Sequence, residues 1–97
     1  MNKEVPEKLL DYRSKIDELD TELIDVLARR FQVVKNVGHL KVQEGMSVVQ
    51  PSRAQEVVDK AMEMGSENGL DPEFIKQLYN LMISHAHDLE DEILEQS

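Results

Sequence analysis

Four basic side chains stand within or beside the apolar pattern of this 97-residue chain: Arg13, Arg30, Lys41 and Arg53. Burying a cation costs on the order of several kcal/mol unless an anionic group meets it. Arg30 and Lys41 are eleven residues apart, so at ~100° per residue they point about 20° apart on a helix, about 16 Å from one another along its axis. Long side chains can reach a common point from these positions, which predicts a small anionic ligand between them.

Arg13 lies 17 residues before Arg30, about 25 Å away along a helix, and so cannot share that ligand within its own chain. In an antiparallel dimer it would enter the partner's site. Arg53 stands at a helix start, where backbone N–H groups and the helix dipole favour an anion. Taken singly, each cation would usually be solvated or paired, as Arg30 could be with a nearby acid. Together they predict a ligand with more than one carboxylate.

Glu90 places an acid in the apolar stripe of the last helix, in i, i+3, i+7, i+10 register with Ile83, Ala86 and Ile93. A lone acid at the edge of a stripe is usually solvated. Beside a cationic pocket, however, it becomes a candidate site residue.

Three helices must position these side chains. A first helix is expected from about residue 7 to about 43, and polar breaks at 43–52 and 66–72 separate it from two shorter helices. A proline marks each expected helix start: Pro6, Pro51 and Pro72. Asn68-Gly69 marks the expected end of the second helix. Aromatic residues make up 4% of the chain and β-branched residues do not alternate with polar ones, so the fold class is all-α.

The first helix would be about 54 Å long, whereas a compact domain of this size has a radius of gyration of about 12 to 13 Å. Its apolar residues form two heptad columns: Leu9, Ile16, Leu23 and Val37; and Tyr12, Leu19, Val26, Val33 and Leu40. Both columns continue along the overhang. The pattern therefore predicts a homodimer in which two long helices pack lengthwise.

Composition excludes several classes of function. The net charge of −9 disfavours nucleic acid and anionic membrane surfaces as partners. The absence of cysteine excludes disulfides and thiolate chemistry. His85 and His87 point about 200° apart on a helix, so no metal site is expected. A single domain over residues 1–97 and a cytoplasmic location are expected, because the N-terminus shows no signal-peptide pattern.

The segments "LLDYRSKIDELDTELIDVLARR", "VGHLK", "PSR" and "GLDPEFIKQLYNLMI" together resemble the all-helical chorismate mutases of the AroQ class. The isochorismate-pyruvate lyases and 4-amino-4-deoxychorismate mutases are relatives within that resemblance. It implies two intertwined three-helix chains with two identical sites. It also implies a [3,3]-sigmatropic rearrangement of chorismate to prephenate that uses no cofactor.

The resemblance assigns roles to individual residues. Arg13 of the partner chain and Arg30 would clamp the two carboxylates of chorismate. Lys41 would donate a hydrogen bond to the ether oxygen of the breaking bond, with Glu90 beside it, and Arg53 would support the ring side. A carboxyl group at position 90 donates a hydrogen bond only when protonated.

This chain departs from the family pattern on the ring side. The family commonly has acids at the positions of Gln50 and Ala54, a hydroxyl at that of Ala86 and a Gln at that of Glu90. The residues that would contact the substrate's carboxylates and ether oxygen are present. The ring substituent is not determined, so the substrate could be chorismate, isochorismate or 4-amino-4-deoxychorismate. The alternative is a non-catalytic interaction module that dimerises through its long helix. A coiled coil with no ligand site would, however, prefer Leu or Ile to Arg at position 30. Pathway and feedback regulation are not fixed by the sequence.

Overall fold

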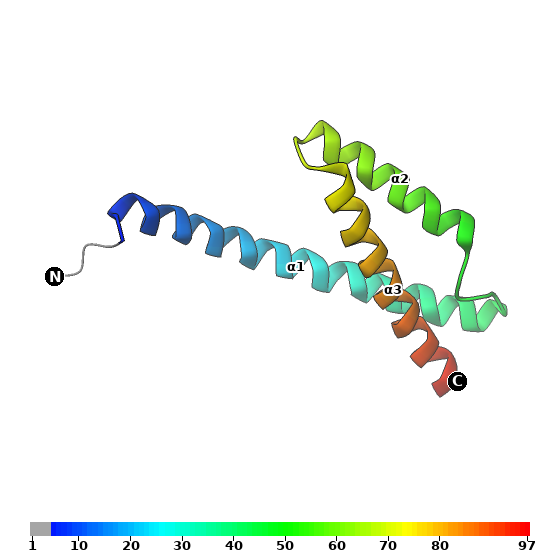
Figure 1. The fold of residues 1–97 in the computed structure, drawn as a ribbon. Helices are drawn as coiled ribbons and strands as arrows, with labels where there is room; N and C mark the ends of the chain where they lie inside the picture. The colour runs from blue at the N-terminus through cyan, green and yellow to red at the C-terminus, as the bar shows by residue number, and fades with distance from the viewer. Residues whose placement is uncertain (1–4) are drawn as a thin grey trace. The chain divides into compact units, whose positions relative to one another are not determined.

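The computed structural model describes residues 5–97, which form three helices and no β-strand. Helix α1 spans Glu7–Glu44, α2 spans Pro51–Glu67 and α3 spans Pro72–Gln96 (Figure 1). The expected order of one long helix and two shorter helices, separated by breaks near residues 43–52 and 66–72, is confirmed. The all-α class is confirmed with it.

Two glycines end the first two helices in the same way. Gly45 and Gly69 have φ values of 65° and 77°, a left-handed region that glycine enters without steric cost. The amide of the residue after each glycine bonds back to a helical carbonyl, Met46 to Lys41 and Leu70 to Gly65, both at 2.8 Å. This arrangement satisfies carbonyl groups that a helix end leaves without partners and turns the chain sharply.

The starts of α2 and α3 differ in their capping. Asp71 caps α3, because its side chain accepts a hydrogen bond of 3.2 Å from the amide of Glu73. Gln50 precedes Pro51 at the start of α2 but makes no side-chain capping bond. The first turn of α2 therefore lacks the cap that most helices receive from this position.

The chain divides into two units, of which the first ends at Gln32 and the second spans Val33–Ser97. In the first unit the ammonium groups of Lys8 and Lys15 lie 5.9 and 5.7 Å from the centre of the Tyr12 ring, within the range of cation–π attraction. The single domain over residues 1–97 stays a prediction.

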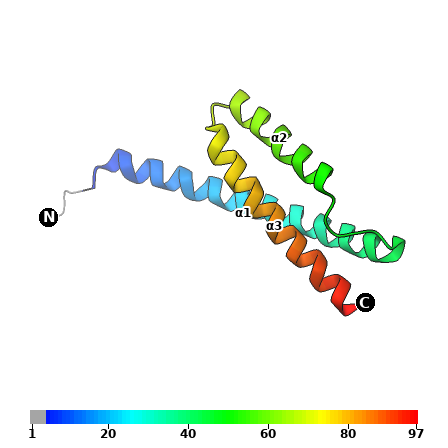
Figure 2. The same cartoon turned by 45° about the vertical axis from the view of Figure 1, so that its right-hand side comes forward.

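In the second unit, α2 and α3 run antiparallel beside each other, and α3 also crosses the last turns of α1 (Figures 1 and 2). The buried apolar side chains of this unit belong to α2 and α3: Val58, Ala61, Ile75 and Ala86. Gly65 lets these helices approach closely, since a Cβ there would lie 2.8 Å from Cγ1 of Ile75. The core is thus small.

The apolar columns of α1 are largely exposed. Every column member is at least 38% accessible: Leu9, Tyr12, Ile16, Leu19, Leu23, Val26, Val33, Val37 and Leu40. Contiguous exposed apolar surface of this kind is typical of interaction sites. One chain therefore leaves uncovered the surface that the heptad pattern predicts to be buried.

Candidate active site

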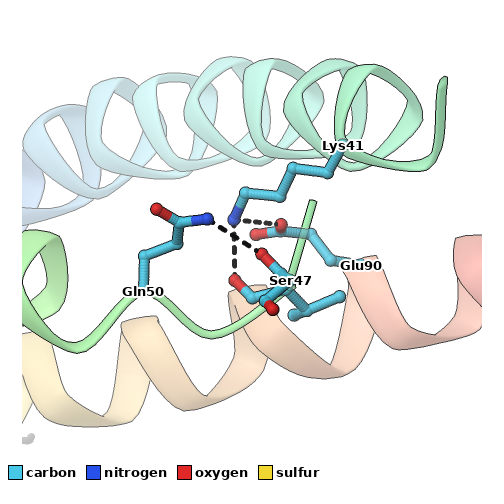
Figure 3. A network of polar contacts seen from close by, with 5 residues as sticks. Lys41, Ser47, Gln50 and Glu90 are labelled. Carbon is cyan, nitrogen blue, oxygen red and sulfur yellow. Dashed lines mark hydrogen bonds and ion pairs between the residues drawn. The ribbon is translucent and has the colours of Figure 1, made fainter. Parts of the chain in front are cut away.

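A buried ion pair joins α1 to α3. The ammonium nitrogen of Lys41 lies 2.8 Å from Oε1 of Glu90, and their side chains are only 15% and 6% exposed. Figure 3 shows the lysine reaching from α1 towards the carboxylate on α3. The structure thus brings together the two residues for which the sequence predicted a shared role.

The carboxylate of Glu90 keeps hydrogen-bonding capacity. Its Oε1 is buried and, although Lys41 is close, the contact lacks the angle of a hydrogen bond, so the atom has no hydrogen-bond partner among residues 5–97. We regard the 2.8 Å contact as an electrostatic pairing, because charge attraction tolerates an angle that a hydrogen bond does not. A buried acceptor in this state favours a further donor.

The loop after α1 holds Lys41 from another side. Its ammonium donates a hydrogen bond of 2.7 Å to the carbonyl of Val48, while its own carbonyl accepts from Met46 at the helix end. The loop therefore folds back over the lysine that precedes it. An ammonium has three N–H donors and the hydrogen bond to Val48 uses one of them, so Lys41 keeps donors for a ligand.

Gln50 lies beside this pair and is half-buried (Figure 3). Its side-chain amide nitrogen donates 3.1 Å to the carbonyl of Ser47. Because a carbonyl only accepts, this bond fixes which end of the amide is the nitrogen. The oxygen of Gln50 lies on the far side of the amide from Lys41 and is a neutral acceptor (Figure 3).

The other predicted site residues lie in different surroundings. Ala86 is buried one turn before Glu90 on α3. Arg53 is exposed on α2 and forms an ion pair with Glu56. Arg13 is exposed and Arg30 half-buried. Both belong to the first unit, so their share in the site stays a prediction.

Sequence reasoning missed two parts of the site. The carbonyl of Val48 carries no side-chain signal, so nothing in the sequence marks it as the partner of Lys41. Gly38 is buried where α1 meets Glu90 and Ile93. A glycine inside a helix, which is costly relative to alanine, was the available signal of a close approach.

The described helices contain none long and apolar enough to cross a membrane. Over the same residues, no three His, Asp or Glu side chains gather so that they could hold a metal ion. What the site offers is a desolvated ammonium, a carboxylate and a neutral amide. Such groups bind and polarise oxygen atoms of a ligand.

The model of the family "Chorismate mutase type II" matches residues 12–91, which include every predicted site residue. This chain belongs to that family. It is 29% identical over 91 residues to a chorismate mutase of Methanocaldococcus jannaschii, covering 94% of this chain and 92% of that protein.

Two further relatives have other names. A 4-amino-4-deoxychorismate mutase of Streptomyces venezuelae is 30% identical over 82 residues, 84% of this chain and 80% of that protein. A bifunctional chorismate mutase/prephenate dehydratase of Aquifex aeolicus is 29% identical over 90 residues, 90% of this chain and 25% of that protein. The family is therefore shown, with more than one activity among its relatives.

We expect Lys41→Met to lower the free energy of unfolding by about 3 kcal/mol, because it leaves the buried Glu90 carboxylate without a counter-charge. Arg53→Met is the matched control. Its exposed pair with Glu56 should be worth less than about 1 kcal/mol. Urea unfolding at one fixed protein concentration measures both, and equal losses in the two variants would contradict burial of the Lys41–Glu90 pair.

Proposed function

We propose that this protein is a chorismate mutase that rearranges chorismate to prephenate. Membership of the family supports the reaction class, as does the M. jannaschii relative that matches over nearly its whole length. The observation that carries the proposal is the largely buried Lys41 ammonium, which is hydrogen-bonded to Val48, paired with Glu90 and still able to donate to a ligand. It supplies the positive group that the breaking ether bond requires.

The rearrangement takes place within one molecule. The ether C–O bond breaks while a C–C bond forms between the enolpyruvyl group and the ring, so atoms and electrons balance inside the substrate. The protein must hold the two reacting ends together, which removes much of the entropic barrier. It must also stabilise the negative charge that grows on the ether oxygen.

Lys41 donates an N–H to that oxygen. Because the ammonium is already removed from water and held on two sides, little reorganisation is needed when charge develops. Glu90 acts on the same oxygen from α3. In its protonated form it donates a second hydrogen bond, whereas its ionised form only accepts.

The carboxylates of the substrate are assigned to Arg30 and to Arg13 of the partner subunit. Guanidinium groups bind carboxylates through paired N–H donors. Arg53 takes the ring side after it leaves its exposed pair with Glu56, which costs little. The uncapped start of α2 adds backbone N–H groups that favour an anion.

Gln50 and Ala86 face the ring in this proposal. Gln50 offers its neutral side-chain oxygen, which takes no part in its bond to Ser47. Ala86 is small and lies one turn before Glu90 on α3, so it adds shape without a hydrogen bond. The polar contact to the ring substituent therefore comes from Gln50.

The functional form in this proposal is a homodimer. The exposed apolar columns of α1 support it, since a second long helix would bury them. The antiparallel arrangement also delivers Arg13 to the partner's site. We expect no nucleic acid or membrane partner, and a cytoplasmic location, as the sequence predicts.

A second candidate is the rearrangement of 4-amino-4-deoxychorismate. The S. venezuelae relative supports it, as does the absence of acids at positions 50 and 54. A neutral amide such as Gln50 accepts a hydrogen bond from a hydroxyl or from an amine. The candidate shares Lys41, Glu90 and the arginines, and differs only at the ring substituent.

Purified protein should convert chorismate to prephenate, identified by mass and absorbance. Isochorismate and 4-amino-4-deoxychorismate are offered separately as controls. Turnover of only one of these would move the assignment to that relative's reaction. No turnover of any of the three, by protein that is folded by circular dichroism, would favour the interaction module.

Glu90→Gln should raise kcat for chorismate, because a side-chain amide always offers a donor for the ether oxygen, whereas a carboxylate only accepts. The expected gain is up to about 10²-fold, the contribution of one oxyanion donor. Steady-state kinetics at neutral pH measure it, and circular dichroism checks that the variant is folded. An unchanged or lower kcat in folded Glu90→Gln would exclude this role of Glu90.

Arg13→Ala and Lys41→Ala chains should each be nearly inactive alone and recover activity when they are unfolded and refolded together. A mixed dimer has one site lacking both residues and one complete site. If half of the dimers are mixed, roughly a quarter of the wild-type activity should return. Mixed dimers seen by mass spectrometry without any recovery would remove Arg13 from the active site.

A further inference from the structure

Gly38 is the buried residue of α1, and α3 passes directly over it. A Cβ at this position would lie 3.1 Å from Cγ of Glu90, 3.1 Å from Cδ1 of Ile93 and 3.4 Å from Cα of Glu90. The first two distances are shorter than ordinary carbon contacts, which begin at about 3.5 Å. A methyl group at position 38 would therefore press on the Glu90 side chain.

Backbone conformation does not explain a glycine here. The positive φ angles among residues 5–97 belong to Gly45 and Gly69, so Gly38 has no need of the left-handed region. A glycine within a helix lowers helix stability relative to alanine. What Gly38 provides is therefore space for Glu90 and Ile93.

This space lies next to the ion pair. Gly38 and Lys41 are three residues apart and so share one face of α1. Glu90 contacts this face twice, with its Cγ over Gly38 and its Oε1 at Lys41. Because Cγ is bonded to the carboxyl carbon, the approach at Gly38 determines how far the carboxylate extends towards the ammonium.

We propose that Gly38 is a positioning residue for the reaction, and that it sets the placement of the Glu90 carboxyl group beside Lys41. The proposal rests on the proposed function for its kinetic consequences. Glu90 and Lys41 are the groups that act on the substrate, and Gly38 acts through them. Position 38 thus tunes catalysis without touching the ligand.

Gly38→Ala should lower kcat for chorismate by about tenfold, because moving a catalytic group by a few tenths of an ångström weakens its bond to the ether oxygen. KM should change by less than about threefold, since the carboxylates of the substrate are held by other residues.

Gly65→Ala is the matched control. Gly65 is also a buried helical glycine packed on α3, and a Cβ there would lie 2.8 Å from Cγ1 of Ile75, an even closer contact than at Gly38. Its neighbours carry no site residue. This variant should lose stability but keep the kcat of its folded fraction.

Two double variants separate positioning from packing. Glu90→Ala removes the Cγ that meets position 38, so adding Gly38→Ala to it should cause no further fall in kcat. Ile93→Val removes the other close atom, Cδ1, so combining it with Gly38→Ala should restore stability while kcat stays low. A purely structural role would instead restore kcat together with stability.

A readout without substrate keeps the test independent of the proposed function. The coupling between Lys41→Met and Glu90→Gln is measured by urea unfolding, in the wild-type and in the Gly38→Ala backgrounds. The coupling should shrink in the second background. A wild type that does not convert chorismate would refute the function alone, whereas an unchanged coupling, or equal kcat losses in Gly38→Ala and Gly65→Ala, would overturn the positioning role.

Discussion

The ion pair between Lys41 and Glu90 joins α1 to α3, and the loop after α1 folds back to complete it. Two charges removed from water must meet each other and find further hydrogen bonds, or the unit loses stability. Val48 provides one such bond through its carbonyl, which requires the chain to turn back immediately after α1. The left-handed glycine at position 45 makes that turn possible. The pair, the loop and the helix end thus depend on one another.

The same pair gives the site its chemical character. The charges of Lys41 and Glu90 are shielded from water in the folded protein, so they are in place before a substrate binds. The ammonium retains donors beyond its bond to Val48, and Oε1 of the carboxylate retains its capacity to accept. These groups suit a reaction whose atoms all remain in one molecule, where the protein orients the substrate and stabilises a growing charge. The family to which the chain belongs is consistent with this chemistry.

Proline and glycine signals in the sequence predicted the helix boundaries closely. They could not predict contacts between residues that are far apart in the chain. Pro51 and Pro72 begin helices and Gly69 ends one, because each acts within a single turn of backbone. Lys41 and Glu90 were found because charges interrupt apolar stripes. The Val48 carbonyl could not be found, since every residue carries a carbonyl. The pairing of Arg53 with Glu56 could not be predicted either, because an exposed ion pair differs little in free energy from the same two side chains in water.

Catalysis in this proposal depends on Lys41 donating a hydrogen bond to the ether oxygen. A crystal structure of the protein with a dicarboxylate analogue of the transition state, one that retains the ether oxygen, tests this directly. We predict the Lys41 ammonium at about 2.8 Å from that oxygen, in the range of charge-assisted hydrogen bonds, with its bond to Val48 kept. An analogue bound with its ether oxygen beyond hydrogen-bond reach of Lys41 would contradict the account.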